Sequence, residues 1–237
     1  MNPSIVQLRG TIFVPKTIGF SDEMKSRFMP LLPNGQVQPV MLPIPPQDPF
    51  LMGQQMIYGG PWKIVKDGRS IIFNQVNVDV IENRVNDQIS SEEDFVKFCV
   101  KVFKTITEYL HYNTRMAYAP TFAMDEVDDF KCKDWWDSMF ASTSIGGMNM
   151  QDINLTFLMK KGFNLNDKKL TLNIHHKIFD GYRYNQDNIK INDSIIVTLD
   201  INTVQDNTIE LDANDVNLFF EKAIDEKKKL MKNYFGV

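Results

Sequence analysis

The chain has 237 residues, of which 43% are hydrophobic and 24% charged, and its formal net charge at pH 7 is -4. These proportions exclude a chain that is too polar to form a core. The small negative charge argues against a nucleic-acid-binding protein, which normally presents a basic surface, and no apolar run approaches the roughly eighteen residues of a transmembrane helix.

The location is predicted from the start of the chain and from its cysteines. The first ten residues contain no basic stretch followed by an apolar core, so we expect no signal peptide and a cytoplasmic protein. Cys99 and Cys132 are expected to be free thiols in a reducing compartment. Lysines on both sides of Cys132 favour a lowered pKa of its thiol. We expect no cofactor and no resident metal ion.

Residues 1–124 are predicted to form strands followed by one long helix. Alternating apolar and polar side chains over 4–15 predict a half-buried strand, and apolar spacing over 20–30 predicts a short helix. Asp67-Gly68 lies between two alternating runs, which is a strong hairpin signal. The return strand of that hairpin is expected to extend from Arg69 to Glu82, with its valines facing inward together.

The long helix of this half is the most regular feature of the sequence. Apolar residues recur at helical spacing over 91–111, and Ser90 with Glu93 matches a capping box. A further strand is expected over 115–124. Because Pro120 cannot donate a main-chain hydrogen bond, we expect this strand at an edge of the sheet.

The segment 30–61 is rich in proline, which predicts an extended or looped backbone. It also carries apolar side chains, among them Phe50 and Met52. Such a loop either packs across its own domain or binds a partner, and packing is favoured because exposed apolar surface is usually avoided. Phe50 and Met52 are therefore candidate binding residues if the loop is exposed.

Residues 125–150 are acidic at their start and glycine-rich towards their end, and we interpret them as a connecting segment. In 151–237, three alternating runs predict three strands, and Asp212 caps a final amphipathic helix. Each half thus has about three strands and then a long helix. The predicted fold class is α+β, with antiparallel sheets each covered by a long amphipathic helix, in two similar halves or one continuous domain.

Two aromatic groups are candidates for binding. Of Trp135 and Trp136, in the connecting segment, one indole is expected to anchor the segment to the core, and the other, if exposed, to contact a partner or ligand. Tyr182, Arg183 and Tyr184 follow a predicted Asp-Gly turn, and tyrosine and arginine are favoured at recognition sites. The alternative is an ordinary turn with two packed tyrosines.

Metal and catalytic motifs are incomplete in this sequence. His175 and His176 are neighbours on a strand and point to opposite faces, so they cannot readily bind one ion, and His176 is expected in the core. The acidic run that begins at Asp125 lacks the spacing and the glycine of a calcium loop. An enzyme would have to use carboxylates with one histidine, drawn from Asp125, Asp128, Asp129, His111 and His176.

The order of the elements is similar to that of a sporadically distributed, uncharacterised bacterial family. Its members place a strand, a sheet and a helix before an arginine-containing strand, which corresponds here to Arg115-Met116-Ala117-Tyr118. That family has an asparagine soon after the tyrosine, whereas this chain has Ala119-Pro120. The resemblance implies a bacterial origin and a general architecture, but no activity and no site residue.

Three functional hypotheses follow. The first is a non-enzymatic binding or assembly protein that contacts a protein partner or a second copy of itself, because the chain combines an apolar loop with thirteen methionines, which suit adaptable surfaces. The second is a small-ligand binder with a pocket between a curved sheet and the final helix, as in helix-grip folds. The third is a carboxylate-dependent enzyme.

Overall fold

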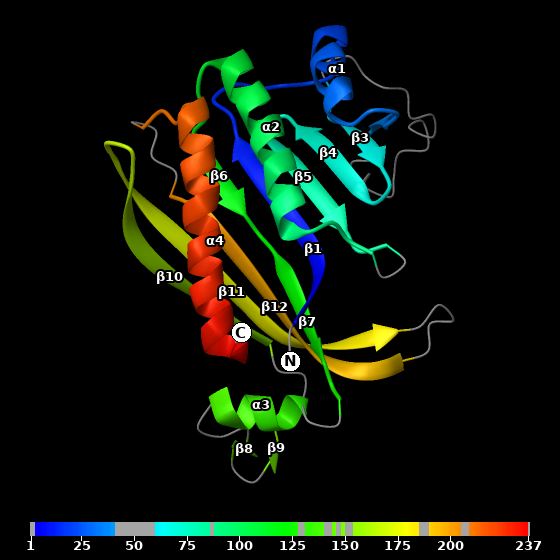
Figure 1. Cartoon of the computed structure of the whole chain (residues 1–237), viewed down its shortest axis with the longest axis vertical. Helices are drawn as coiled ribbons and strands as arrows, with labels where there is room; N and C mark the ends of the chain where they lie inside the picture. The colour runs from blue at the N-terminus through cyan, green and yellow to red at the C-terminus, as the bar shows by residue number, and fades with distance from the viewer. Residues whose placement is uncertain are drawn as a thin grey trace, which may run out of the picture.

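The computed structural model describes residues 3–40, 60–85, 88–127, 131–139, 144–145, 148–149, 154–184, 190–204 and 209–236. The fold is α+β, as predicted (Figure 1). The helices are α1 (Asp22–Phe28), the 3-10 helix η1 (Met29–Leu31), α2 (Glu92–Leu110), α3 (Cys132–Met139) and α4 (Ala213–Phe235). The strands are β1 (Ser4–Phe13), β2 (Gln36–Pro39), β3 (Trp62–Lys66), β4 (Arg69–Asn74), β5 (Asn77–Asn83), β6 (Arg115–Tyr118), β7 (Thr121–Asp125), β8 (Ser144–Ile145), β9 (Met148–Asn149), β10 (Asn154–Leu165), β11 (Lys168–Tyr184) and β12 (Lys190–Thr203).

Strands from both predicted halves belong to one antiparallel sheet. In the described residues it has ten strands, in the order β10-β11-β12-β6-β1-β5-β4-β3-β2, and β7 pairs with both β1 and β12. The separate sheets expected for the two halves are therefore one sheet. The short strands β8 and β9 pair with each other outside it. The domain boundaries at residues 124 and 151 stay a prediction.

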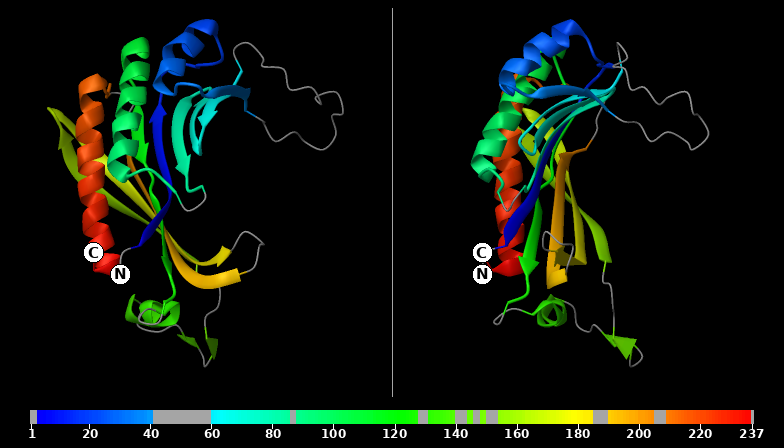
Figure 2. Two further views of the ribbon diagram at one scale, coloured as in Figure 1. Left: turned by 45° about the vertical axis from the view of Figure 1, so that its right-hand side comes forward. Right: turned by 90° about the vertical axis from the view of Figure 1, so that its right-hand side faces the viewer.

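The long helices α2 and α4 lie side by side on one face of the sheet, and both views of Figure 2 place α1 on that side as well. The apolar side of α2 is buried against β1 and β5, through residues that include Phe95, Cys99 and Val102. The rings of Phe103 and Phe220 meet between the two helices, with centroids 5.5 Å apart. The core therefore lies between the sheet and this pair of helices.

The helix ends are set by capping residues, as the sequence predicts, with one shift. Asp212 caps α4 through a capping box with Asp215. The cap of α2 is Ser91 and not Ser90, because the Ser91 hydroxyl accepts a hydrogen bond from the main-chain N–H of Asp94 at 3.1 Å. The Ser90 side chain is used elsewhere, and its hydroxyl accepts a hydrogen bond from Arg69.

Two strand predictions are wrong at their turns. The return strand after Asp67-Gly68 is two strands, because the chain turns at Gln75-Val76 between β4 and β5, and Val76 is 58% exposed instead of facing inward. The turn expected at Asp180-Gly181 is not formed. Both residues lie inside β11, where they pair with Ile195 and Ser194 of β12.

Residues 115–125 lie in the middle of the sheet, so the edge position predicted from Pro120 is wrong. β6 ends before this proline and β7 begins after it, and together they fill the position between β1 and β12. Because the strand is interrupted at Pro120, no main-chain N–H is needed from this residue. Its carbonyl oxygen still accepts a hydrogen bond from Leu199 N at 3.1 Å. A proline is therefore accommodated in a central position because the strand is interrupted there.

Gly10 of β1 allows α2 to approach the sheet closely, and an alanine at this position is expected to destabilise the fold. A Cβ there would lie 2.9 Å from Cys99 Sγ and 3.2 Å from Phe103 Cζ. We expect Gly10→Ala to lower the free energy of unfolding by about 1–3 kcal/mol, as overpacked cores do. Urea denaturation measures this change. Gly162→Ala on β10 is the control, because a Cβ there would meet nothing within 4 Å, and equal losses in both variants would contradict the explanation.

Candidate functional site

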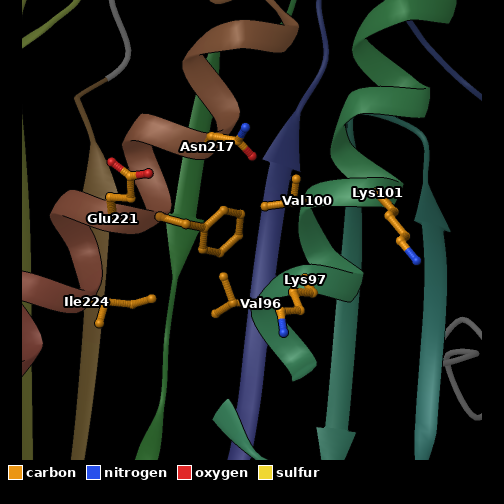
Figure 3. A pocket seen from close by; sticks show the side chains of 8 residues that line it. Val96, Lys97, Val100, Lys101, Asn217, Glu221 and Ile224 are labelled. Atoms are coloured by element: carbon orange, nitrogen blue, oxygen red, sulfur yellow. The ribbon is translucent and has the colours of Figure 1, made fainter. Parts of the chain in front are cut away.

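A shallow groove of about 410 Å³ runs between α2 and α4 on the outer surface of the helix layer (Figure 3). Val96, Val100 and Ile224 point into it from the two helices, and charged side chains such as Lys97 and Glu221 stand at its border. Its floor is Phe220, whose ring packs on Tyr118 of the sheet at 5.9 Å between centroids. The groove therefore ends on packed core at this point.

A buried ion pair connects the two helices with the sheet. Lys227 of α4 donates to Glu92 Oε2 at 2.5 Å, and the Tyr118 hydroxyl donates to Glu92 Oε1 at 2.5 Å. The side chains of Lys227 and Glu92 are only 10% and 19% exposed. Burial, followed by the neighbouring Glu92 carboxylate, raises the pKa of Tyr118 well above its usual value. The three groups satisfy one another, and we assign them a structural role.

The outer edge of β10 carries three consecutive exposed apolar side chains. Nine of the twelve residues of this strand are exposed. Phe157, Leu158 and Met159 are 40%, 45% and 47% exposed, although they follow one another in an edge strand. Among the described strands, only β11 pairs with β10, so the other side of its main chain is open. Long apolar edges of this kind are surfaces on which another strand can pair.

These three side chains lie on both faces of the sheet. Phe157 is opposite His176, which is buried on the helix-covered side, so Phe157 and Met159 belong to that side. Leu158 is opposite His175 and belongs to the other face. A partner strand at this edge would therefore cover apolar side chains above and below the sheet.

The opposite edge of the sheet is protected. Its strand, β2, has only four residues, of which three are Gln36, Gln38 and Pro39. Short length and proline are the means by which proteins prevent unwanted pairing at an edge strand. The two edges therefore differ sharply, and the β10 edge is the one suited to binding.

Beneath β10, His176 connects the strand layer with the end of α4. Its ring stacks on Phe157, with centroids 4.4 Å apart, and its Nδ1 is 2.5 Å from the Tyr234 hydroxyl. Its Nε2 is buried without a hydrogen-bond partner among the described residues. The prediction that His176 lies in the core is confirmed, and its packing supports the position of Phe157 at the edge.

Lowering the pH is expected to weaken the fold through His176. Burial lowers the pKa of His176 from its usual 6.5, and the charge of His175 lowers it further. The unfolded chain therefore binds this proton at a higher pH than the folded chain. As a result, the free energy of unfolding falls as the pH drops from about 6.5 to the lowered pKa of His176 in the folded chain. The fall is at most about 1.4 kcal/mol per pH unit.

Urea denaturation between about pH 7.5 and pH 5 measures this dependence. His176→Gln is expected to remove the part of the decline that begins near pH 6.5, while His111→Asn, outside this cluster, keeps it. The explanation fails if wild type and His176→Gln lose stability in parallel over this range.

The predicted binding residues of the connecting segment are buried. Trp135 Nε1 donates to the carbonyl oxygen of Tyr234 at 2.8 Å, and Trp136 Nε1 donates to Asp180 Oδ1 at 2.6 Å. Both indoles therefore anchor α3 to the rest of the fold. A contact role required one exposed indole, and both indoles are buried. Neither tryptophan is therefore part of the surface proposed below.

Of the other predicted binding residues, only Tyr182 has a described side chain, and it lies beyond the part of β11 that pairs with β10. Tyr182 is exposed on β11, with Lys190 Nζ 4.0 Å from the centre of its ring. Arg183 and Tyr184 end the same strand, and their side chains lie outside the described residues. Phe50 and Met52 also lie outside them. A binding role for these residues stays a prediction.

Cys132 does not have the activated thiol that its flanking lysines suggested. It lies in the first turn of α3 and is buried. Burial, followed by the nearby carboxylates of Glu126 and Asp180, raises the pKa of this thiol to about 12. The lysines that adjoin it in the sequence are outweighed by the acidic side chains that adjoin it in space.

Of the three acids named for the enzyme hypothesis, the structure describes only Asp125. Asp125 accepts a hydrogen bond from the Ser194 hydroxyl at 2.6 Å, whereas Asp128 and Asp129 lie outside the described residues. In the part of the chain that is described, no group of three or more His, Cys, Asp or Glu side chains is placed to hold a metal ion.

Comparison of the chain with protein-family models, with curated proteins and with solved structures finds no match. The resemblance to an uncharacterised bacterial family stays a prediction. Among the described residues, no helix has both the length and the apolar character that crossing a membrane requires.

Sequence reasoning missed the β10 edge. The alternation of Ile153, Leu155, Phe157 and Met159 places these residues on one strand face, but it does not indicate whether that face is covered. One signal was available. Leu158 breaks the alternation, so both faces of the strand are apolar at this point, and such a strand needs cover on two sides.

Proposed function

We propose that this chain is a non-enzymatic assembly protein that binds a protein strand along the free edge of β10. The observation that supports this proposal is the exposure of Phe157, Leu158 and Met159 on a twelve-residue edge strand. An added strand would take up the open main-chain donors and acceptors, and its side chains would cover the apolar residues on both faces. Main-chain pairing would supply affinity, and the apolar contacts would supply the register.

The two alternative functions have less support. A helix-grip ligand would lie between the sheet and α4, where Val216, Phe219 and Phe220 are buried in the core. A carboxylate enzyme would need acids that converge on a histidine, and His176 contacts Tyr234 and Phe157 instead. We therefore favour assembly over both.

We take the shared element order of residues 1–124 and 151–237 as a sign of two related halves joined in one sheet. A cytoplasmic location is supported by Cys99 and Cys132, which are both free and buried, because stable disulfides are typical of secreted proteins. The net charge of -4 favours a protein partner over nucleic acid.

Site-specific cross-linking in the cells that naturally produce the protein tests this function. A photoreactive phenylalanine analogue replaces Leu158 in one variant and Val76, an exposed residue far from β10 in the sheet, in the other. We expect a defined protein adduct, either with a second copy or with another protein, at position 158 only. The adduct should disappear when Phe157→Lys and Met159→Lys are added. No adduct at 158, or equal adducts at both positions, would overturn the proposal.

A further inference from the structure

We infer that the strand bound by β10 is the β10 strand of a second copy, in an antiparallel pair around a twofold axis at Leu158. This inference rests on the proposed function, because it takes the β10 edge as the binding surface. It adds the identity of the partner and the register of the pair. The resulting dimer would carry one sheet across both copies, with α2 and α4 of each copy on the same side of it.

The register follows from the positions of the exposed apolar residues and of the lysines. With the axis at Leu158, this residue meets its own copy, and Phe157 lies opposite Met159 of the second copy. The three exposed apolar residues then cover one another, and sulfur–aromatic contacts of this kind are favourable. Lys160 falls opposite Thr156 of the second copy, so no two lysines face each other.

Other axes are less favourable. An axis at Lys160 or Lys161 would place identical charges directly opposite each other, which destabilises a strand pair. Those axes would also separate Phe157 from Met159 of the second copy, and an axis at Lys160 would place Met159 opposite Lys161. Lys161 is paired with Glu226 of α4 at 2.8 Å, so the repulsion would be strongest for an axis at Lys160. The apolar and the charged residues therefore select the same region of the strand.

The contrast between the two sheet edges favours a closed dimer over an open chain of molecules. A head-to-tail contact between β10 and β2 would leave a free edge on every added copy, and it would extend without limit. The four residues of β2, which end at Pro39, offer little main chain for such a contact. Pairing of β10 with β10 uses the long edge twice and leaves only the protected edges outside.

Sedimentation of the purified full chain with charge-swapped variants tests this inference. The wild type is expected to sediment at twice the 27.5 kDa of one chain. Leu158→Lys and Leu158→Glu each place like charges on the axis, and each is expected to sediment as one chain. An equimolar mixture of the two is expected to recover the doubled mass, because opposite charges then meet on the axis. Val76→Lys, at a similarly exposed position elsewhere, should sediment as the wild type does.

The mixture keeps the test valid if a single variant is merely damaged, because a damaged chain would not regain the doubled mass. A wild type that sediments as one chain would overturn this inference. If the wild type sediments as one chain but the variant with the photoreactive residue at position 158 forms a cross-link with another protein, the proposed function stands and only the partner is different. A doubled mass that persists in Leu158→Lys would place the dimer contact away from β10 and overturn the inference as well.

Discussion

Lys227→Ala is expected to lower the free energy of unfolding by about 3–5 kcal/mol. The substitution would leave the Glu92 carboxylate in a largely buried site, without the cation that lies 2.5 Å from it. The cost of an unpaired buried charge exceeds the value of the pair itself, which is why the expected loss is large. The pair also joins α4 to the first turn of α2 and, through Tyr118, to the sheet.

Urea denaturation followed by circular dichroism measures this loss. The matched control is Lys229→Ala in the same helix, because Lys229 also pairs with a glutamate, Glu226, but its own side chain is 64% exposed. Exposed pairs of this kind contribute about 0–1 kcal/mol. The double variant Glu92→Gln with Lys227→Met should recover much of the lost stability, because no charge remains buried. Equal losses in Lys227→Ala and Lys229→Ala would contradict the burial argument.

Asp79→Ala is expected to lower the free energy of unfolding by about 3 kcal/mol or more, because several donors lose their acceptor together. This buried carboxylate lies on the face of the sheet opposite α2. Its Oδ1 accepts from Thr11 at 2.5 Å and from Arg9 at 2.9 Å, and its Oδ2 accepts from Asn74 and Asn77 at 3.0 Å each. The network joins β1, β4 and β5, so its loss should weaken that end of the sheet.

The control for this prediction is Asn83→Ala on the same strand. It removes an exposed hydrogen bond, from Gln7 Nε2 to Asn83 Oδ1 at 2.7 Å, and is expected to change the free energy of unfolding by about 0.5 kcal/mol or less. Urea denaturation compares the two variants. If Asp79→Ala is as stable as Asn83→Ala, the network is not a source of stability.

The helices were predictable because their signals are local. The apolar spacing of α2 and α4 and the cap at Asp212 can be read from consecutive residues, and they are found where expected. The turn at Gln75-Val76 was missed because it lacks glycine and proline, although the polar pair Asn74-Gln75 interrupts the alternation there. A turn that lacks the residues of the common turn types is difficult to predict from the sequence.

The order of the sheet could not be predicted, because it depends on contacts between distant residues. The position of β6 and β7 between β1 and β12 is specified by pairs such as Thr11 with Ala117 and Ile201 with Tyr118. No local pattern carries this information. The interruption at Pro120 was even misleading, since a broken strand can occupy the centre of a sheet.

The candidate site could be predicted only in part. Alternation identifies which side chains of β10 share a face, but burial of that face depends on how far α4 reaches across the sheet. Phe157 packs on His176 and still remains 40% exposed, because it lies at the last strand of the sheet. An edge strand and a central strand have the same alternation, so exposure of this edge had to come from the structure.

Amide hydrogen exchange over residues 154–165 tests most directly whether the β10 edge is covered by a second copy. In concentrated wild-type protein, we predict that the amides on both sides of β10 are protected, and that Leu158→Lys exposes those of the outer side to exchange within seconds. Protection on the outer side should also fall when the wild type is diluted below its dissociation constant. Rapid exchange of the outer amides in the wild type at every concentration would contradict the account.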